Sequence, residues 1–309
     1  MTAAEDEEGA ERPAFRAGLV SVIGRPNVGK STLVNALVGQ KVAIVSEKPQ
    51  TTRNRILAVV NKPSGQIVLF DTPGIHKPMH RMNERMVEAA VRSLDQVDLV
   101  VWVVDLGEGY GPGDRYVREK LRRSKKPVML AINKIDTAPR PRILPAIEQY
   151  RQFLDFEEIV PLSALTGENV DLLGNLLLAH LPEGERLYPE DYLTDQPERF
   201  FVAEMIREQI LRQTREEIPY STGVVIDSFK EGDPVVRIDA SILVERDTQK
   251  AILIGRGGTM LKAIGTGARR EIEAFLGTRV YLGLFVKVRE RWREDPAVLG
   301  EMGLGKRAE

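Results

Sequence analysis

The chain has 309 residues and a formal net charge of −1, with 42% hydrophobic and 29% charged residues, which is typical of a soluble protein large enough for two domains. It contains no cysteine and three histidines, so disulfides, thiolate zinc sites and cysteine nucleophiles are excluded. No apolar stretch approaches the ~20 residues that a membrane-spanning helix needs. We therefore expect a cytoplasmic location.

The first 15 residues are rich in acids where a signal peptide would need positive charge and an apolar run, so residues 1–15 are expected to form a disordered acidic tail. Between residues 19 and 181, short Val/Ile/Leu runs alternate with helical patterns, which is typical of a parallel sheet covered by helices. Strands are predicted at 19–23, 56–61, 66–70, 98–104, 127–132 and 158–161, and helices near 31–38, 82–94, 113–124, 142–154 and 170–180. The connection at 62–65 is too short for a crossover helix, so the second and third strands should form an antiparallel hairpin at one edge. Residues 16–181 are thus predicted to be an α/β domain with a mostly parallel six-stranded sheet and helices on both faces.

The first strand leads into a glycine-rich loop that fits the pattern G-x-x-x-x-G-K-[ST]. A strand, a tight turn and a helix in this order direct backbone N–H groups at a triphosphate, which makes this a P-loop. Its residues are Gly24, Arg25, Pro26, Asn27, Val28, Gly29, Lys30, Ser31 and Thr32. We expect Lys30 to reach the β/γ-phosphates and Ser31 to hold Mg²⁺. Asn27 either helps to bind a monovalent cation, K⁺, or only supports the turn, and both alternatives stay open.

Three further motifs follow predicted strands at the same edge of the sheet, and they point to guanine nucleotides, GTP and GDP. They are Asp71-Thr72-Pro73-Gly74, followed by Ile75; Asn133-Lys134-Ile135-Asp136; and Ser163-Ala164. Asp71 is expected to hold Mg²⁺ through water, and the Gly74 N–H to sense the γ-phosphate. Asp136 can accept two hydrogen bonds from guanine that adenine does not offer, and Ser163-Ala164 can offer a backbone N–H to the guanine O6.

The loop before the second strand is expected to act as switch I, with Gln50, Thr51, Thr52, Arg53 and Asn54. One threonine there can bind Mg²⁺ only while the γ-phosphate is present; Thr52 is the first choice and Thr51 the second. Many GTPases carry a water-orienting glutamine where this chain has Ile75, so intrinsic GTP hydrolysis should be slow. His76 is expected to be a surface residue rather than a base.

Prolines and glycine between residues 182 and 197 break helix and strand alike, so this stretch is predicted to be a linker. Beyond it we expect a helix at 199–217, strands at 222–229 and 235–245, a short strand leading into a glycine loop and helix between 251 and 275, and a strand at 280–288. The order α-β-β-α-α-β suits an α+β module over residues 198–290. Residues 291–309 form a C-terminal tail without a predicted element.

The second glycine loop matches the G-x-x-G of RNA-binding KH domains. Between residues 250 and 293, ten basic residues accompany three acidic ones, a surplus that attracts phosphate. The expected RNA-binding residues are Ile254, Gly255, Arg256, Gly257, Gly258, Lys262, Arg269 and Arg270. A protein surface or an anionic membrane is the alternative partner for this basic face, and no DNA partner is expected.

These motifs together resemble the Era family of bacterial GTPases, whose C-terminal domain is a KH domain. The similarity rests on the nucleotide motifs, on Gln50-Thr51-Thr52-Arg53, on Glu217-Ile218-Pro219-Tyr220-Ser221 and on the segment from Ile252 to Gly258. The resemblance implies a type II KH domain, binding to the 3′ end of 16S ribosomal RNA, and assistance to assembly of the small (30S) ribosomal subunit. It also implies a Mg²⁺-dependent GTPase. Peripheral contact with the inner face of the cell membrane is a further expectation from the basic face, and a tRNA-modifying GTPase is a weaker alternative because no flavin, cysteine or zinc motif accompanies the GTPase motifs.

Overall fold

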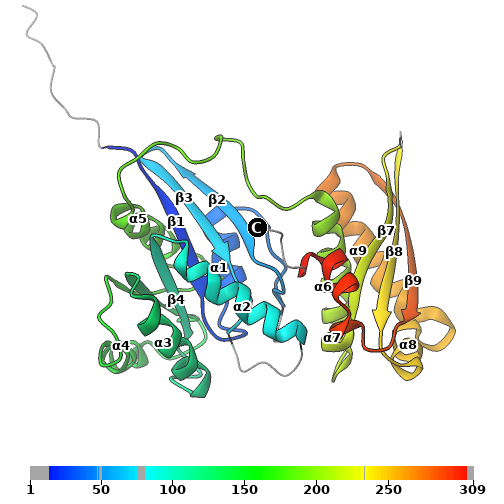
Figure 1. Ribbon diagram of the computed structural model, residues 1–309, viewed down its shortest axis with the longest axis horizontal. Helices are drawn as coiled ribbons and strands as arrows, with labels where there is room; N and C mark the ends of the chain where they lie inside the picture. The colour runs from blue at the N-terminus through cyan, green and yellow to red at the C-terminus, as the bar shows by residue number, and fades with distance from the viewer. Residues whose placement is uncertain (1–13, 47, 49–50, 76–80, 233, 305–309) are drawn as a thin grey trace, which may run out of the picture.

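The computed structural model describes residues 14–46, 48, 51–75, 81–232 and 234–304. Two domains lie side by side (Figure 1). The first contains a six-stranded sheet in the order β2-β3-β1-β4-β5-β6, built from β1 (Arg16–Ile23), β2 (Ile56–Lys62), β3 (Gly65–Asp71), β4 (Leu99–Asp105), β5 (Val128–Asn133) and β6 (Ile159–Pro161). All strand pairs are parallel except β2 with β3. The predicted edge hairpin and mostly parallel sheet are confirmed.

Helices cover both faces of this sheet because its strands are apolar on both sides. The helices are α1 (Lys30–Val38), α2 (Arg81–Asp95), α3 (Pro112–Ser124), α4 (Ile143–Arg151) and α5 (Val170–His180). Residues of α1 and α5 share one buried cluster with the sheet, and residues of α2, α3 and α4 share the other. Helix α4 ends before the predicted position 154, where the chain turns into the loop that leads to β6.

The second domain packs helices on one face of a three-stranded sheet, β7-β8-β9. Its elements are α6 (Glu198–Gln213), α7 (Ile218–Ser221), β7 (Gly223–Lys230), β8 (Val235–Val244), α8 (Asp247–Ile254), α9 (Thr259–Leu276) and β9 (Arg279–Val288). Strands β7 and β8 are antiparallel, whereas β8 and β9 are parallel. The α+β module is confirmed.

Two details of the predicted module are wrong. The short strand expected before the glycine loop is the helix α8, because the Gln249 side chain accepts hydrogen bonds from the N–H groups of Glu245 and Arg246 and caps the helix start. An apolar run of four residues does not by its periodicity separate a strand from a buried helix. The helix expected over 199–217 ends at Gln213, since Thr214 has an extended backbone.

The segment between the domains follows the free edge of β2. The Val59 N–H donates to the Leu193 carbonyl at 2.9 Å, and the buried Gln66 side chain accepts from the N–H groups of Leu187 and Tyr188. This pairing covers an edge that would otherwise offer unpaired backbone groups to other chains.

Residues 289–304, which follow β9, fold back between the two domains, where Figure 1 shows them in red. They form η3 (Trp292–Glu294), α10 (Pro296–Leu299) and η4 (Gly300–Leu304). Trp292 is fully buried, and with Leu299 it shares an apolar cluster with Met82 and Met86 of α2. No helix in the described part of the chain has the length and apolar character needed to cross a bilayer.

Candidate nucleotide and RNA sites

Two glycines give the P-loop its shape. Gly24 and Gly29 have φ angles of +156° and +95°. A Cβ on Gly29 would lie 2.2 Å from the Asn133 Nδ2, and one on Gly24 would lie 2.3 Å from the Val103 carbonyl oxygen, so no larger residue fits at either position. Helix α1 begins at Lys30 directly after this turn, and its N-terminus adjoins a cavity of about 410 Å³. A helix N-terminus of this kind favours phosphate.

Three oxygen-bearing side chains meet at the start of α1. The Ser31 Oγ lies 2.7 Å from the Asp71 Oδ2 and 2.6 Å from the Thr52 Oγ1, and the Thr52 Oγ1 lies 3.2 Å from the same carboxylate oxygen. Asp71 is fully buried, and burial raises its pKa while the hydrogen bond from Ser31 opposes the shift. Two hydroxyls and a carboxylate are the hard oxygen donors that Mg²⁺ prefers, so these residues fit the ion.

Thr51 occupies a different place. Its hydroxyl donates to the Lys48 carbonyl at 2.6 Å, and its own carbonyl accepts from Arg207 of α6. Of the two threonines considered, Thr52 is the one that lies beside Ser31 and Asp71.

Lys30 is buried within the P-loop, and its Nζ donates to the Arg25 carbonyl at 2.8 Å. Burial lowers the pKa of Lys30 to about 8, and the negative charge of Asp71 limits that shift. A buried ammonium with one carbonyl partner is prepared for a phosphate, because a phosphate would replace the hydration that burial removed.

The base side of the cavity is organised by Asn133. Its Nδ2 donates to the Val28 carbonyl at 2.8 Å and its Oδ1 accepts from the Ala164 N–H at 2.9 Å, so it ties the P-loop to the loop after β6. Ser163-Ala164 was expected to offer a backbone N–H to the guanine O6, and the Ala164 N–H is engaged in the bond to Asn133 here. Asp136 is exposed at the cavity, and Lys134 beside it pairs with Asp105 at 2.7 Å.

Some predicted nucleotide residues lie outside the cavity lining. Arg25 pairs with Asp114 and Glu108 at 3.0 and 3.2 Å, and Ile75 is fully buried in the core beneath the sheet. Val28, Thr72 and Ile135 are buried as well. Gln50 and His76 lie outside the described residues. Sequence reasoning missed the exposed Leu165, with 79% of its surface accessible, and Ile44, Val45, Ser46 and Thr137, all of which line the cavity; as single apolar or hydroxyl side chains in loops they carry no motif.

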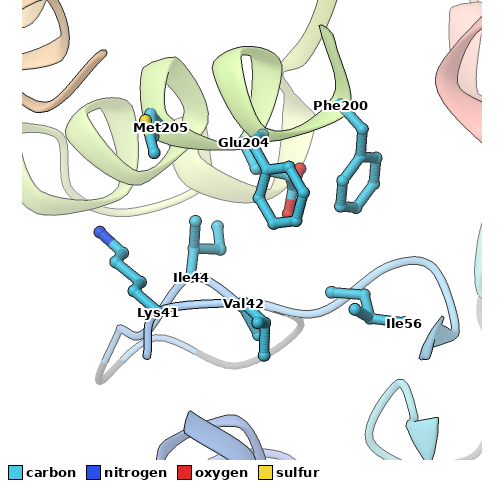
Figure 2. Close-up of a pocket in the computed structure, with 9 residues that line it drawn as sticks. Lys41, Val42, Ile44, Ile56, Phe200, Glu204 and Met205 are labelled. Carbon is cyan, nitrogen blue, oxygen red and sulfur yellow. The ribbon is translucent and has the colours of Figure 1, made fainter. Parts of the chain in front are cut away.

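The loop that contains switch I lies directly against the second domain at its described residues, 40–46, 48 and 51–55. Figure 2 shows Val42 and Ile44 below α6, with the Ile44 side chain pointing up toward the helix that carries Met205 and the Val42 side chain pointing away from it, into the buried cluster of the first domain. Lys41 pairs with Glu208 at 2.5 Å and with Glu271 of α9 at 3.1 Å, and Lys48 donates to the carbonyls of Leu211 and Thr214. These cations were not singled out in the sequence because lysines in a loop usually face solvent.

Two buried arginines complete this contact. Arg53 donates to the Thr222 carbonyl at 2.8 Å and to the Pro219 carbonyl at 3.5 Å. Burial lowers the pKa of Arg53 to about 9, and nearby Arg207 adds to the shift. Thr51 and Arg53, the two neighbours of the expected Mg²⁺ ligand Thr52, are therefore both hydrogen-bonded to the second domain.

The predicted RNA loop lies on the surface of the second domain. Gly255, Gly257 and Gly258 have φ angles of +72°, +60° and +78°, a left-handed conformation that favours glycine. The loop opens onto a groove of about 690 Å³ between α9 and the edge strand β9. Lys262 and Arg269 line the groove, whereas the exposed Arg270 is not among its lining residues.

Comparison with known proteins agrees with this architecture. Residues 19–134 match the model of the 50S ribosome-binding GTPase family, and residues 217–293 match that of the KH domain. The chain is 52% identical over 298 residues to GTPase Era of Heliobacterium modesticaldum, covering 96% of this chain and 99% of that protein. It is 48% identical over 289 residues to GTPase Era of Staphylococcus haemolyticus, covering 93% and 97%.

Solved structures give the same result. The crystal structure of Era in complex with MgGDPNP and nucleotides 1506–1542 of 16S ribosomal RNA has a TM-score of 0.91 and 43% sequence identity, covering 94% of this chain and 99% of that one. That of a point variant of Aquifex aeolicus Era bound to GDP·AlF₄⁻ has a TM-score of 0.90 and 43% identity, covering 94% and 100%. The chain therefore belongs to the Era family of GTPases, with a GTPase domain followed by a KH domain.

Proposed function

We propose that this protein is a GTP-hydrolysing switch that binds 16S ribosomal RNA near its 3′ end and assists assembly of the small ribosomal subunit. The observation that carries the proposal is the contact between switch I and the KH domain. Thr51 and Arg53, on either side of Thr52, are both hydrogen-bonded to the KH domain. A nucleotide that moves Thr52 would therefore act on the KH domain through adjacent residues, and we propose this contact as the element whose two arrangements couple the two sites.

On the nucleotide side, Ser31, Thr52 and Asp71 would hold Mg²⁺, which supplies positive charge to the phosphates when it is bound. Lys30 and the N–H groups at the start of α1 bind phosphate oxygens, and Asp136 selects guanine. Ile75 has its side chain in the core and cannot orient an attacking water, so we propose a slow intrinsic rate. K⁺ beside Asn27 is a further proposal. Asn27 has a φ of +66°, which asparagine tolerates, so its role in the turn is an equally good reason for its presence.

On the RNA side, the KH groove would clamp about four nucleotides, with their backbone against residues 255–258. The relative's complex with nucleotides 1506–1542 supports this choice of RNA. The cytoplasm is the proposed location. The alternative is a regulatory GTPase whose basic face binds protein or an anionic membrane at the inner face of the cell membrane.

The proposal is tested by titrating the RNA of nucleotides 1506–1542 into the protein with a non-hydrolysable GTP analogue or with GDP. We expect tighter binding with the analogue. The variant Gly257→Asp/Gly258→Asp should lose the RNA, since acidic side chains beside the groove repel phosphate; a Cβ at either position meets nothing within 4 Å, and aspartate tolerates positive φ, so the fold should survive. Arg256→Gln should weaken binding. It should also lower the salt slope, the magnitude of the slope of the logarithm of the RNA binding constant against the logarithm of the salt concentration, by about 0.7.

Two results would contradict the proposal. One is RNA binding by the double-aspartate variant that equals that of the parent at physiological salt. The other is binding to vesicles of anionic lipid, lost in the same variant, in a protein that does not bind the RNA; this result would favour the alternative.

A further inference from the structure

The KH sheet has a second face that its helices do not cover. On β9, Val280 and Val286 are buried in the domain core with Leu282 and Leu284 packed against it, so the alternate residues of the strand point to the opposite face. The C-terminal segment covers part of that face, where Val225 and Leu243 join its apolar cluster. The remainder lies on β9, the strand of this sheet farthest from the GTPase domain in Figure 1.

Two aromatic rings stand exposed on this uncovered part. Tyr281 is 56% and Phe285 53% accessible. They are four residues apart on one strand, which places them about 13 Å from each other, with Gly283 between them. A Cβ on Gly283 would lie 3.6 Å from the Phe285 ring. Because glycine has no side chain, no side chain projects between the two rings. We call Tyr281, Gly283 and Phe285 the aromatic row.

Charged groups surround the aromatic row. The Arg237 guanidinium lies 5.7 Å from the centre of the Tyr281 ring, and Arg279 is exposed two residues before Tyr281. Lys287 pairs with Asp227 at 3.4 Å. A carboxylate is also present, because the Asp239 Oδ1 lies 2.3 Å from the position of a Gly283 Cβ.

The aromatic row continues the KH groove. Arg279 and Tyr281 belong to the groove lining, and Phe285 follows Tyr281 along the same strand. A strand of RNA that leaves the groove over the edge of β9 therefore meets the two rings next.

We infer that the aromatic row extends the KH groove onto the uncovered face of the sheet, and that unpaired bases of the RNA held in the groove stack on it. This inference rests on the proposed function. Bases stack on aromatic side chains whatever their sequence, and arginines beside the rings attract the phosphates. The Asp239 carboxylate disfavours phosphate over Gly283 and accepts hydrogen bonds from the amino group of a base, so the bases, and not the backbone, face the row.

The test uses the RNA of nucleotides 1506–1542 with the GTP-analogue-bound protein. Tyr281→Ala and Phe285→Ala should each weaken binding about fivefold or more, and Phe285→Tyr, which keeps a ring, should restore it. The matched control is Leu144→Ala, which truncates a 72% accessible side chain on α4 of the other domain and should leave the affinity unchanged. Removing a ring should not alter the salt slope, whereas Arg237→Gln should lower it by about 0.7.

A fluorescent reporter gives an independent reading. Both tryptophans of the chain, Trp102 and Trp292, are fully buried, so a tryptophan introduced by Tyr281→Trp is distinguished by its solvent-exposed emission. Its emission should be quenched when the RNA binds. When the RNA is shortened stepwise from one end, the quenching should disappear at a length that still binds in the groove.

The outcomes separate the two proposals. Failure of the parent to bind the RNA would refute the proposed function. If the parent binds, the double-aspartate variant of the loop does not, and the ring variants bind as the parent does, the aromatic row is not an RNA surface. Dimerisation of the free parent that Phe285→Ala abolishes, without a change in RNA affinity, would overturn the inference in favour of contact with a second copy.

Discussion

Replacing Arg53 by methionine should weaken the coupling between the nucleotide and the RNA sites while both sites remain intact. Arg53 is 3% exposed, belongs to switch I and donates to two carbonyls of the KH domain, those of Thr222 and Pro219. Methionine keeps most of the volume and removes the guanidinium. The change leaves Ser31, Thr52, Asp71 and the groove untouched.

The size of the effect follows from the contacts of this one side chain. A hydrogen bond from a charged group is worth about 1.5–3 kcal/mol, and only the bond to Thr222 is short; the one to Pro219, at 3.5 Å, adds little. The Arg53 Nε has no hydrogen-bond partner among the described residues, and burial lowers the pKa of Arg53 to about 9, so desolvation offsets part of the gain. We therefore take the lower figure, about 1.5 kcal/mol, which corresponds to about a tenfold change in an equilibrium constant.

The assay is the ratio of the dissociation constants for the RNA of nucleotides 1506–1542 with GDP and with the GTP analogue. This ratio should fall about tenfold in Arg53→Met. If the ratio of the parent is itself below about ten, it should fall to one. The matched control is Arg16→Met, which removes a guanidinium bond of 2.7 Å to the Leu181 carbonyl, remote from the KH domain. A parent-like ratio in Arg53→Met, with normal affinity for GTP, would refute the reasoning that switch I acts through this contact.

Three further predictions concern the nucleotide. Asp136→Asn should move the preference from GTP to xanthosine triphosphate, because the amide donates where the carboxylate accepts; unchanged GTP affinity in a titration would remove the guanine assignment. GTP hydrolysis should be faster in K⁺ than in Na⁺ at equal ionic strength, and Asn27→Ala should abolish this difference while nucleotide binding survives. Asn27→Gly, which relieves the positive φ, should abolish the difference as well. Equal hydrolysis rates of the parent in the two salts would contradict the cation site. For Lys30, the folded pKa of about 8 lies below the ordinary 10.5, so stability of the nucleotide-free protein should rise with pH between these values. GTP affinity should fall up to about tenfold per pH unit above 8, because binding must then take up a proton. In the variant Lys30→Arg, whose side chain stays charged, GTP affinity measured by calorimetry should depend less on pH. A parent affinity that does not change from pH 7 to 9 would show that Lys30 is charged in the free protein.

The chemistry of the nucleotide site could be predicted from the sequence because its requirements are local. Gly24 and Gly29 are needed by the backbone of one turn, and Asp71 and Asn133 are placed by the strands that end at them. Parallel strands present their carboxyl ends at one edge of the sheet, so the separate motifs had to meet there. The choice between Thr51 and Thr52 could only be ranked, since neighbouring residues in a loop have no periodicity.

Tertiary structure alone decided how the two domains act on each other. In the sequence, Lys41, Lys48 and Arg207 do not differ from the charged residues of any solvated surface. Only the packing of α6 against the loop that contains switch I gives them partners. The sequence predicts residues 280–288 as one strand, because its periodicity shows that side chains alternate between two faces but not which face is covered. The helices cover the face of Val280 and Val286, which left Tyr281 and Phe285 in solvent. Trp292 lay in a segment with no predicted element, since its burial depends on α2 of the other domain, more than 200 residues earlier in the chain.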